Sequence, residues 1–140
     1  MSNVSADLIW EVTRSQNAFL VKRKTGGSPQ FSRDPLNLTN VHSRKALGVT
    51  ATEKGVQVLS KKAGSANKPA SGLTSVNYGK TSRKTYKAVA RQAAANGYRS
   101  DLREAAVARA SAIRRSQRAV KPSPEPKLRG SAAKRAAAKQ

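Results

Sequence analysis

The residues best able to do chemistry in this chain are few and scattered. His42 is the only histidine, cysteine is absent, and the seven acidic residues stand singly along the sequence. Acid–base, nucleophilic and metal chemistry each need several converging groups, and no GxSxG, HExxH or phosphate-loop glycine pattern supplies them. We therefore expect no enzyme activity, no catalytic role for His42, and no metal, cofactor or small-molecule substrate.

Basic residues are the chemistry that this chain has in quantity. It contains 28 Lys and Arg against 7 Asp and Glu in 140 residues, a formal net charge of +21. A polyanion cancels such a charge over a wide surface, and nucleic acid fits better than a membrane because no apolar run of roughly 18 residues is present. The surface of an ordinary soluble protein would carry more Asp and Glu beside this many Lys and Arg. The cations expected to bind RNA are Lys22, Arg23, Lys24, Arg44, Lys45, Lys61, Lys62, Lys68, Arg83, Lys84, Arg99, Arg103, Arg114, Arg115, Arg118 and Lys121.

The remaining composition narrows the class of protein further. Without cysteine, disulfide scaffolds, zinc ribbons and thiol catalysis are excluded, and a reducing compartment is the easier interpretation. Aromatic residues are only 4% of the chain, so base stacking on an aromatic platform has weak support. Among these aromatics, Trp10 and Phe19 are expected in the core because aliphatic residues surround them, whereas Tyr98, in a basic turn, could be core or contact.

The first half of the chain predicts a helix and a sheet. Ser5 followed by Asp7 is typical of a capped helix that continues to Val12. Residues 18–24 are rich in β-formers and end before a glycine pair, which predicts a strand and a turn. Residues 41–62 predict a hairpin, with strands around a turn at residues 53–55 and an alternating pattern that begins at Val56.

The second half predicts an exposed loop, two helices and a tail. Residues 63–81 are dominated by small and polar residues, so they are expected to form an exposed loop. Apolar spacing then predicts a helix over residues 82–96 with Gly97 at its end, and a second from Ser100 as N-cap to about residue 119. Prolines from Pro122 onward stop it, and the Ala- and Lys-rich end has little to bury.

These elements together predict an α+β fold. It has a small antiparallel sheet with an N-terminal helix and two C-terminal helices, followed by a disordered basic tail. The expected divisions are a small α+β domain over residues 1–62, a basic Gly/Ser/Pro loop over 63–81, a two-helix region over 82–120 and a basic extension over 121–140.

The second predicted helix has both an apolar and a basic side. Leu102, Ala106, Ala110 and Ile113 form a narrow apolar stripe. At about 100° per residue, four arginines fall beside that stripe and are expected to follow a phosphate backbone. These are Arg99, Arg103, Arg114 and Arg118.

Five short segments of the sequence together resemble segments of a known protein family. They are residues 19–23 (FLVKR), 42–49 (HSRKALGV), 68–70 (KPA), 98–103 (YRSDLR) and 109–113 (RASAI). In order and spacing, over roughly residues 5–120, the chain resembles the eukaryotic large-subunit ribosomal protein family numbered twenty-eight. It departs from the animal members in a shorter connection between Phe31 and Val41 and in its Ala-rich end.

The resemblance implies a non-catalytic, eukaryote-specific protein on the large ribosomal subunit. Its partners would be large-subunit ribosomal RNA, an expansion segment among the candidates, and neighbouring ribosomal proteins, with no membrane. Its place would be the cytoplasmic ribosome after nucleolar transit during assembly. The alternative is a ribosome-assembly factor with a related domain, although that family is longer and has cysteines and an acidic region. A chromatin-type DNA-binding protein has the charge but no recognisable DNA-binding motif here.

Overall fold

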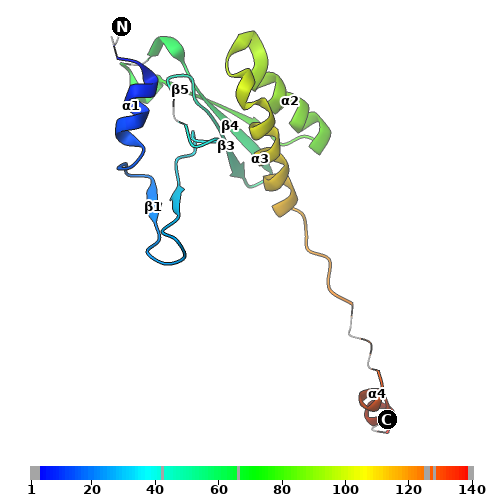
Figure 1. The fold of residues 1–140 in the computed structure, drawn as a ribbon. Helices are drawn as coiled ribbons and strands as arrows, with labels where there is room; N and C mark the ends of the chain where they lie inside the picture. The colour runs from blue at the N-terminus through cyan, green and yellow to red at the C-terminus, as the bar shows by residue number, and fades with distance from the viewer. Residues whose placement is uncertain (1–3, 42, 66, 125–126, 128, 139–140) are drawn as a thin grey trace.

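Antiparallel strand pairing builds two separate sheets in the computed structural model of the protein (Figure 1). The structure describes residues 4–41, 43–65, 67–124, 127 and 129–138. The helices are α1 (Ala6–Thr13), α2 (Ser82–Ala94), α3 (Arg103–Ser116) and α4 (Ser131–Ala137), and four 3-10 turns lie at Ala63–Ser65, Pro69–Ser71, Ala95–Gly97 and Ser100–Leu102. The strands are β1 (Leu20–Lys22), β2 (Gln30–Ser32), β3 (Leu47–Thr52), β4 (Gly55–Lys61) and β5 (Leu73–Tyr78). The predicted α+β class is confirmed.

The N-terminal helix and hairpin begin as their sequences dictate. The Ser5 Oγ accepts a hydrogen bond from the Leu8 N–H at 3.2 Å, which caps α1. Strand β1 is the predicted strand, and it pairs with β2, which the sequence did not predict. The turn between them uses positive φ values at Gly26 and Gly27, where glycine carries no steric penalty.

The three-stranded sheet has the order β3-β4-β5. The predicted hairpin is confirmed as β3 and β4, with Thr52 paired to Gly55 across the turn. The expectation of an exposed loop over residues 63–81 is wrong for β5, which pairs with β4 from Val56↔Tyr78 to Lys61↔Leu73. Strand β5 is an edge strand whose exposed positions alternate with half-buried ones, so its outward residues give it the composition of a loop.

One core joins this sheet to the two long helices. Figure 1 shows α2 and α3 together on one side of the sheet, with α1 and its hairpin on the other side in this view. The predicted apolar stripe is confirmed at Leu102, in the 3-10 turn before α3, and at Ala106 and Ala110 on α3, all of which are buried, while Ile113 is half-buried against the core. The buried cluster comprises Leu47, Val49, Val56, Val58, Val89, Ala93, Leu102, Ala106 and Ala110. The core therefore draws on both residues 1–62 and residues 82–120.

A close backbone approach fixes the segment before β3 against the other face of the sheet. A Cβ at Gly48 would collide with the Pro35 carbonyl oxygen, so only glycine fits there. Leu36, beside it, is only 8% exposed. This contact brings residues 35–45 toward the end of the sheet at which β4 ends.

Three expectations need correction. Phe19 is 47% exposed and Trp10 only half-buried, because α1 and the β1–β2 hairpin pack against each other and not into the main core. Ser100 does not cap α3, which begins at Arg103 after a 3-10 turn and ends at Ser116. The tail is expected from the sequence to be disordered, yet it contains the short helix α4, which its high alanine content permits.

Candidate nucleic-acid interface

The cations predicted to bind RNA differ in exposure. Lys61, Arg99 and Arg114 are half-buried, and the side chains of Arg99 and Arg114 take part in contacts within the protein. The exposed ones are Lys22, Arg23, Lys24, Arg44, Lys45, Lys62, Lys68, Arg83, Lys84, Arg103, Arg115, Arg118 and Lys121. Exposed Arg44 also takes part in the fold, because its Nη2 donates to the Val4 carbonyl. The structure therefore separates cations that make contacts within the protein from cations that are only at the surface.

Three basic residues meet at one end of the three-stranded sheet. Arg44, Lys61 and Lys62, which we call the sheet-end cluster, line a hollow of about 390 Å³. Its lining also includes Leu36 and Leu73 but no acidic residue. The cluster forms because β4 ends at Lys61, and because residues 35–45 are held near that end by the approach at Gly48. Lys45 and Lys68 belong to the same chain segments and are exposed.

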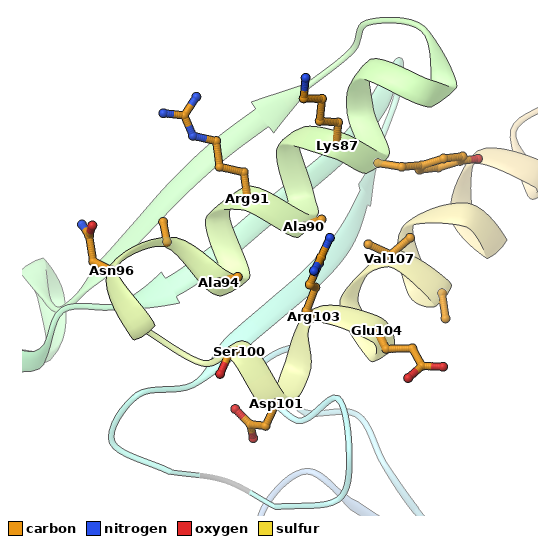
Figure 2. A pocket seen from close by; sticks show the side chains of 13 residues that line it. Lys87, Ala90, Arg91, Ala94, Asn96, Ser100, Asp101, Arg103, Glu104 and Val107 are labelled. Atoms are coloured by element: carbon orange, nitrogen blue, oxygen red, sulfur yellow. The ribbon is translucent and has the colours of Figure 1, made fainter.

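A second cationic surface lies between α2 and α3. An open groove of about 1370 Å³ is lined by Lys87, Arg91 and Arg103, with Asp101 and Glu104 as the acids. Figure 2 shows Lys87 and Arg91 extending from α2, and Arg103 reaching from α3 toward Ala90 and Ala94. Glu104 points away from α2 in the same view. We call Lys87, Arg91 and Arg103 the groove cations.

Two of these groove cations were missed in the sequence. Lys84, Lys87 and Arg91 are spaced by three and four residues, which places them along one side of a helix. That spacing was a usable signal, because all three are exposed on α2. The predicted Arg83 and Lys84 lie in the first turn of the same helix.

The third basic surface is the turn of the β1–β2 hairpin. Lys22 ends β1, and the Arg23 backbone N–H donates to the Pro29 carbonyl at 3.2 Å, closing the turn. Lys22, Arg23 and Lys24 are all exposed. The structure thus presents these three cations together at the end of the hairpin.

Arg99 is a clamp between the helices and the sheet. Its Nη1 donates to the Lys45 carbonyl at 2.8 Å, and its Nε and Nη2 donate to the Asp101 carboxylate at 2.9 and 2.7 Å. The hydrogen bonds from Arg99 lower the pKa of Asp101, and those to Asp101 raise the pKa of Arg99. Only 16% of the Arg99 side chain is exposed.

Tyr98 acts beside Arg99 and resolves an open question from the sequence. Its hydroxyl donates toward the Ala46 and Lys61 carbonyls at 3.1 and 2.7 Å, and its ring packs against the core. Burial raises the pKa of the Tyr98 hydroxyl, which stays protonated as a donor. Tyr98 is therefore a structural residue that ties the turn between α2 and α3 to the ends of β3 and β4.

Arg114 holds the other end of α3. Its Nη1 and Nη2 approach the Lys54 and Lys80 carbonyls at 3.5 and 3.4 Å. Nearby, the Gln117 Nε2 donates to the Thr52 and Gly55 carbonyls at 2.8 and 2.7 Å. Since Arg114 points to the sheet, it does not continue an exposed row of arginines.

The expected single arginine row on α3 is therefore wrong in its geometry. Arg99 precedes the helix and turns to Lys45, Arg114 turns to the sheet, and Arg118 follows the end of α3. Only Arg103 lies within α3 on the open groove. Arg115, Arg118 and Lys121 are exposed where the chain leaves α3.

Two further kinds of site are absent from the described part of the structure. No group of three His, Cys, Asp or Glu residues that could hold a metal is found there. His42 lies outside the described residues, so its predicted lack of a catalytic role stays a prediction. Among the described helices, none has the length and apolar character needed to cross a membrane.

Comparison with known proteins gives matches to a single ribosomal protein family. Residues 8–116 match the Ribosomal L28e protein family. The chain is 43% identical over 127 residues to the large ribosomal subunit protein eL28 of Schizosaccharomyces pombe, covering 83% of this chain and 95% of that protein. It is 33% identical over 122 residues to the protein of the same name from Caenorhabditis elegans, covering 81% of this chain and 91% of that protein.

Proposed function

The chain belongs to the Ribosomal L28e protein family, and from this premise we propose that it is a structural protein of the large subunit of the eukaryotic cytoplasmic ribosome. In this role it binds and stabilises ribosomal RNA and has no catalytic activity. The names of the two relatives support the large subunit, and the match extends over 95% and 91% of their lengths. The observation that carries RNA binding is the set of exposed cations on rigid elements of the described structure.

The sheet-end cluster and the groove cations are the main proposed RNA contacts. The first has three basic and no acidic residues around a hollow, and the second combines a lysine with two arginines along an open groove. Arg side chains suit bidentate contacts with phosphate, and Lys adds a mobile charge. Contacts of this kind position RNA without reading its sequence.

The proposed stabilisation of ribosomal RNA follows from the separation of these three basic surfaces on one domain. The cluster lies at one end of the sheet, the groove lies on α2 and α3, and Lys22–Lys24 lie at the hairpin turn. Each can neutralise a different stretch of phosphate backbone, so the protein would hold separate RNA segments together. An expansion segment is one candidate for such a segment, and neighbouring ribosomal proteins complete the proposed partners. We place the protein in cytoplasmic ribosomes after passage through the nucleolus.

A salt titration of RNA binding tests this proposal. Arg103, Lys87 and Arg91 are changed together to Gln, and Lys54→Gln serves as the control, since Lys54 is an exposed lysine at the β3–β4 turn outside both surfaces. Binding of large-subunit RNA fragments should be steeply salt-dependent, and its slope should fall by roughly three units in the triple variant. Lys54→Gln should change it by less than one. An unchanged slope in the triple variant would remove the groove from the interface.

A further inference from the structure

Helix α1 exposes large apolar side chains to an unusual degree. It has eight residues and buries none of them. Leu8, Ile9 and Val12 are 57%, 45% and 70% exposed. A helix of this length is marginal in water without packing support. Its apolar side thus lacks a cover in the part of the chain that the structure describes.

Other exposed apolar residues lie close to α1 in the sequence and fold. Of the nine exposed large hydrophobic residues in the described structure, six fall within residues 4–31, Phe19 and Phe31 among them. Ile9, Trp10 and Phe19 line a hollow of about 170 Å³ between α1 and the base of the β1–β2 hairpin, and Asp34 lines it as well. Concentrated apolar exposure around a recess marks an interaction surface, where one anchoring side chain commonly enters.

Charge separates this surface from the rest of the protein. Helix α1 contains Asp7 and Glu11, whereas the whole chain has a net charge of +21 and the adjoining hairpin carries Lys22 and Arg33. Arg14 is paired with Glu11 at 3.3 Å, and α1 itself has no Lys or Arg. The charge of α1 is therefore complementary to a basic protein and not to phosphate.

We infer that α1 and the base of the β1–β2 hairpin dock a basic neighbouring protein. An aliphatic side chain of that partner contacts Ile9, Trp10 and Phe19 in the hollow, and a cation of the partner faces Asp7. The inference rests on the proposed function, because the large subunit supplies the neighbour. The protein then docks its neighbour through α1 and the hairpin base, while the groove cations face RNA from the other side of the three-stranded sheet (Figure 1). The hairpin turn at Lys22–Lys24 and the sheet-end cluster remain RNA contacts outside the docking surface.

Photo-crosslinking of the full chain in cells tests this division. A benzophenone amino acid is placed at Val12, which is 70% exposed, or at Lys87, an exposed groove cation. After irradiation, large subunits are isolated and the adducts identified by mass spectrometry. The expected adduct at position 12 is a basic segment of another large-subunit protein, and at position 87 it is RNA.

The adducts also separate the ways in which the inference can fail. RNA, a second copy of this chain, its own tail, or no adduct at position 12 while position 87 crosslinks to RNA would overturn the docking surface alone. Absence of the protein from large subunits would contradict the proposed function, and the inference with it.

A double substitution gives a second, independent measurement. Leu8→Ser with Val12→Ser removes exposed apolar groups, so the melting temperature should stay within a few degrees, whereas occupancy of washed large subunits should fall about ten-fold. Val120→Ser is the matched control, because Val120 is 94% exposed and lies outside the surface. A double variant that is retained as well as the control contradicts the inference.

Discussion

Exchanging Arg99 for glutamine should weaken the fold and leave RNA binding unchanged. The Arg99 guanidinium joins the turn before α3 to the Lys45 carbonyl at 2.8 Å and to the Asp101 carboxylate. Arg99 has a non-helical backbone conformation, and glutamine, like arginine, has an unbranched side chain. Glutamine has no charge, however, and its amide cannot reach both partners in the same geometry. The substitution therefore removes the clamp and hardly alters the backbone preference of the turn.

The expected loss of stability is about 2 kcal/mol. A charged donor to a carbonyl contributes roughly 1.5–3 kcal/mol, and the ion pair with Asp101 adds at most about 1 kcal/mol because that carboxylate is 61% exposed. Arg103→Gln is the matched control, since Arg103 is exposed on the groove. Surface substitutions of that kind usually change stability by less than about 0.5 kcal/mol.

Urea unfolding and salt-dependent RNA binding are measured on both variants. Arg99→Gln should lower the unfolding free energy and leave the salt slope of RNA binding unchanged. Arg103→Gln should leave the unfolding free energy nearly unchanged and reduce the salt slope by roughly one unit. Equal stability of Arg99→Gln and the unsubstituted protein would refute the clamp. A reduced salt slope in Arg99→Gln under conditions where it is folded would return Arg99 to the RNA interface.

Three further outcomes are expected. Tyr98→Phe removes the hydroxyl donor of the Lys61 carbonyl, whereas the Ala46 carbonyl keeps the Lys61 N–H as a donor, so the substitution should cost about 1–3 kcal/mol of unfolding free energy; a cost near zero in urea unfolding would mean that water replaces the hydroxyl. The lowered pKa of Asp101 means that its charged form stabilises the native state above the pKa of the unfolded chain, and that this contribution is lost as the pH falls through the folded pKa. Asp101→Asn should therefore be less stable at neutral pH and approach the unsubstituted protein in acid, and a pH-independent difference in melting temperature would contradict this. Removal of residues 122–140 should keep the melting temperature within a few degrees, because none of the described residues of this segment belongs to the core, while RNA affinity falls; a large loss of melting temperature would mean that the tail packs on the domain.

The elements with strong local signals could be predicted from the sequence. Val56 and Val58 alternate with polar residues after a turn ending at Gly55, and they form the hairpin strand β4. The apolar spacing that predicted two C-terminal helices is realised in α2 and α3, which bury Val89 and Ala106. These signals depend only on neighbouring residues, so no tertiary information was needed.

Elements that depend on distant partners could not be predicted. Strand β5 has the polar Ser75 and Asn77 at two of its three exposed positions, and only its pairing with β4 makes it a strand. Trp10 and Phe19 have core-like sequence surroundings, yet the sequence does not say which part of the protein faces them. Their exposure reflects the packing of α1 outside the main core.

The candidate site was predictable in composition but not in arrangement. The arginine row assumed one helical phase from Arg99 to Arg118, whereas residues 100–102 form a 3-10 turn with about three residues per turn. That change of phase, and the contacts of Arg99 and Arg114 with distant carbonyls, redirect half of the row. The sheet-end cluster joins residues from different segments, so only the fold could bring Arg44 to Lys62.

The most direct test of the account is where the protein is found in the cell. A tagged full chain is followed through sucrose gradients, before and after large subunits are washed in high salt, with polysomes and nucleolar precursors collected separately. A structural protein of the large subunit should sediment with polysomes and remain on washed large subunits in near-stoichiometric amount. Recovery only with nucleolar precursors, or complete release by the wash, would contradict the proposed role.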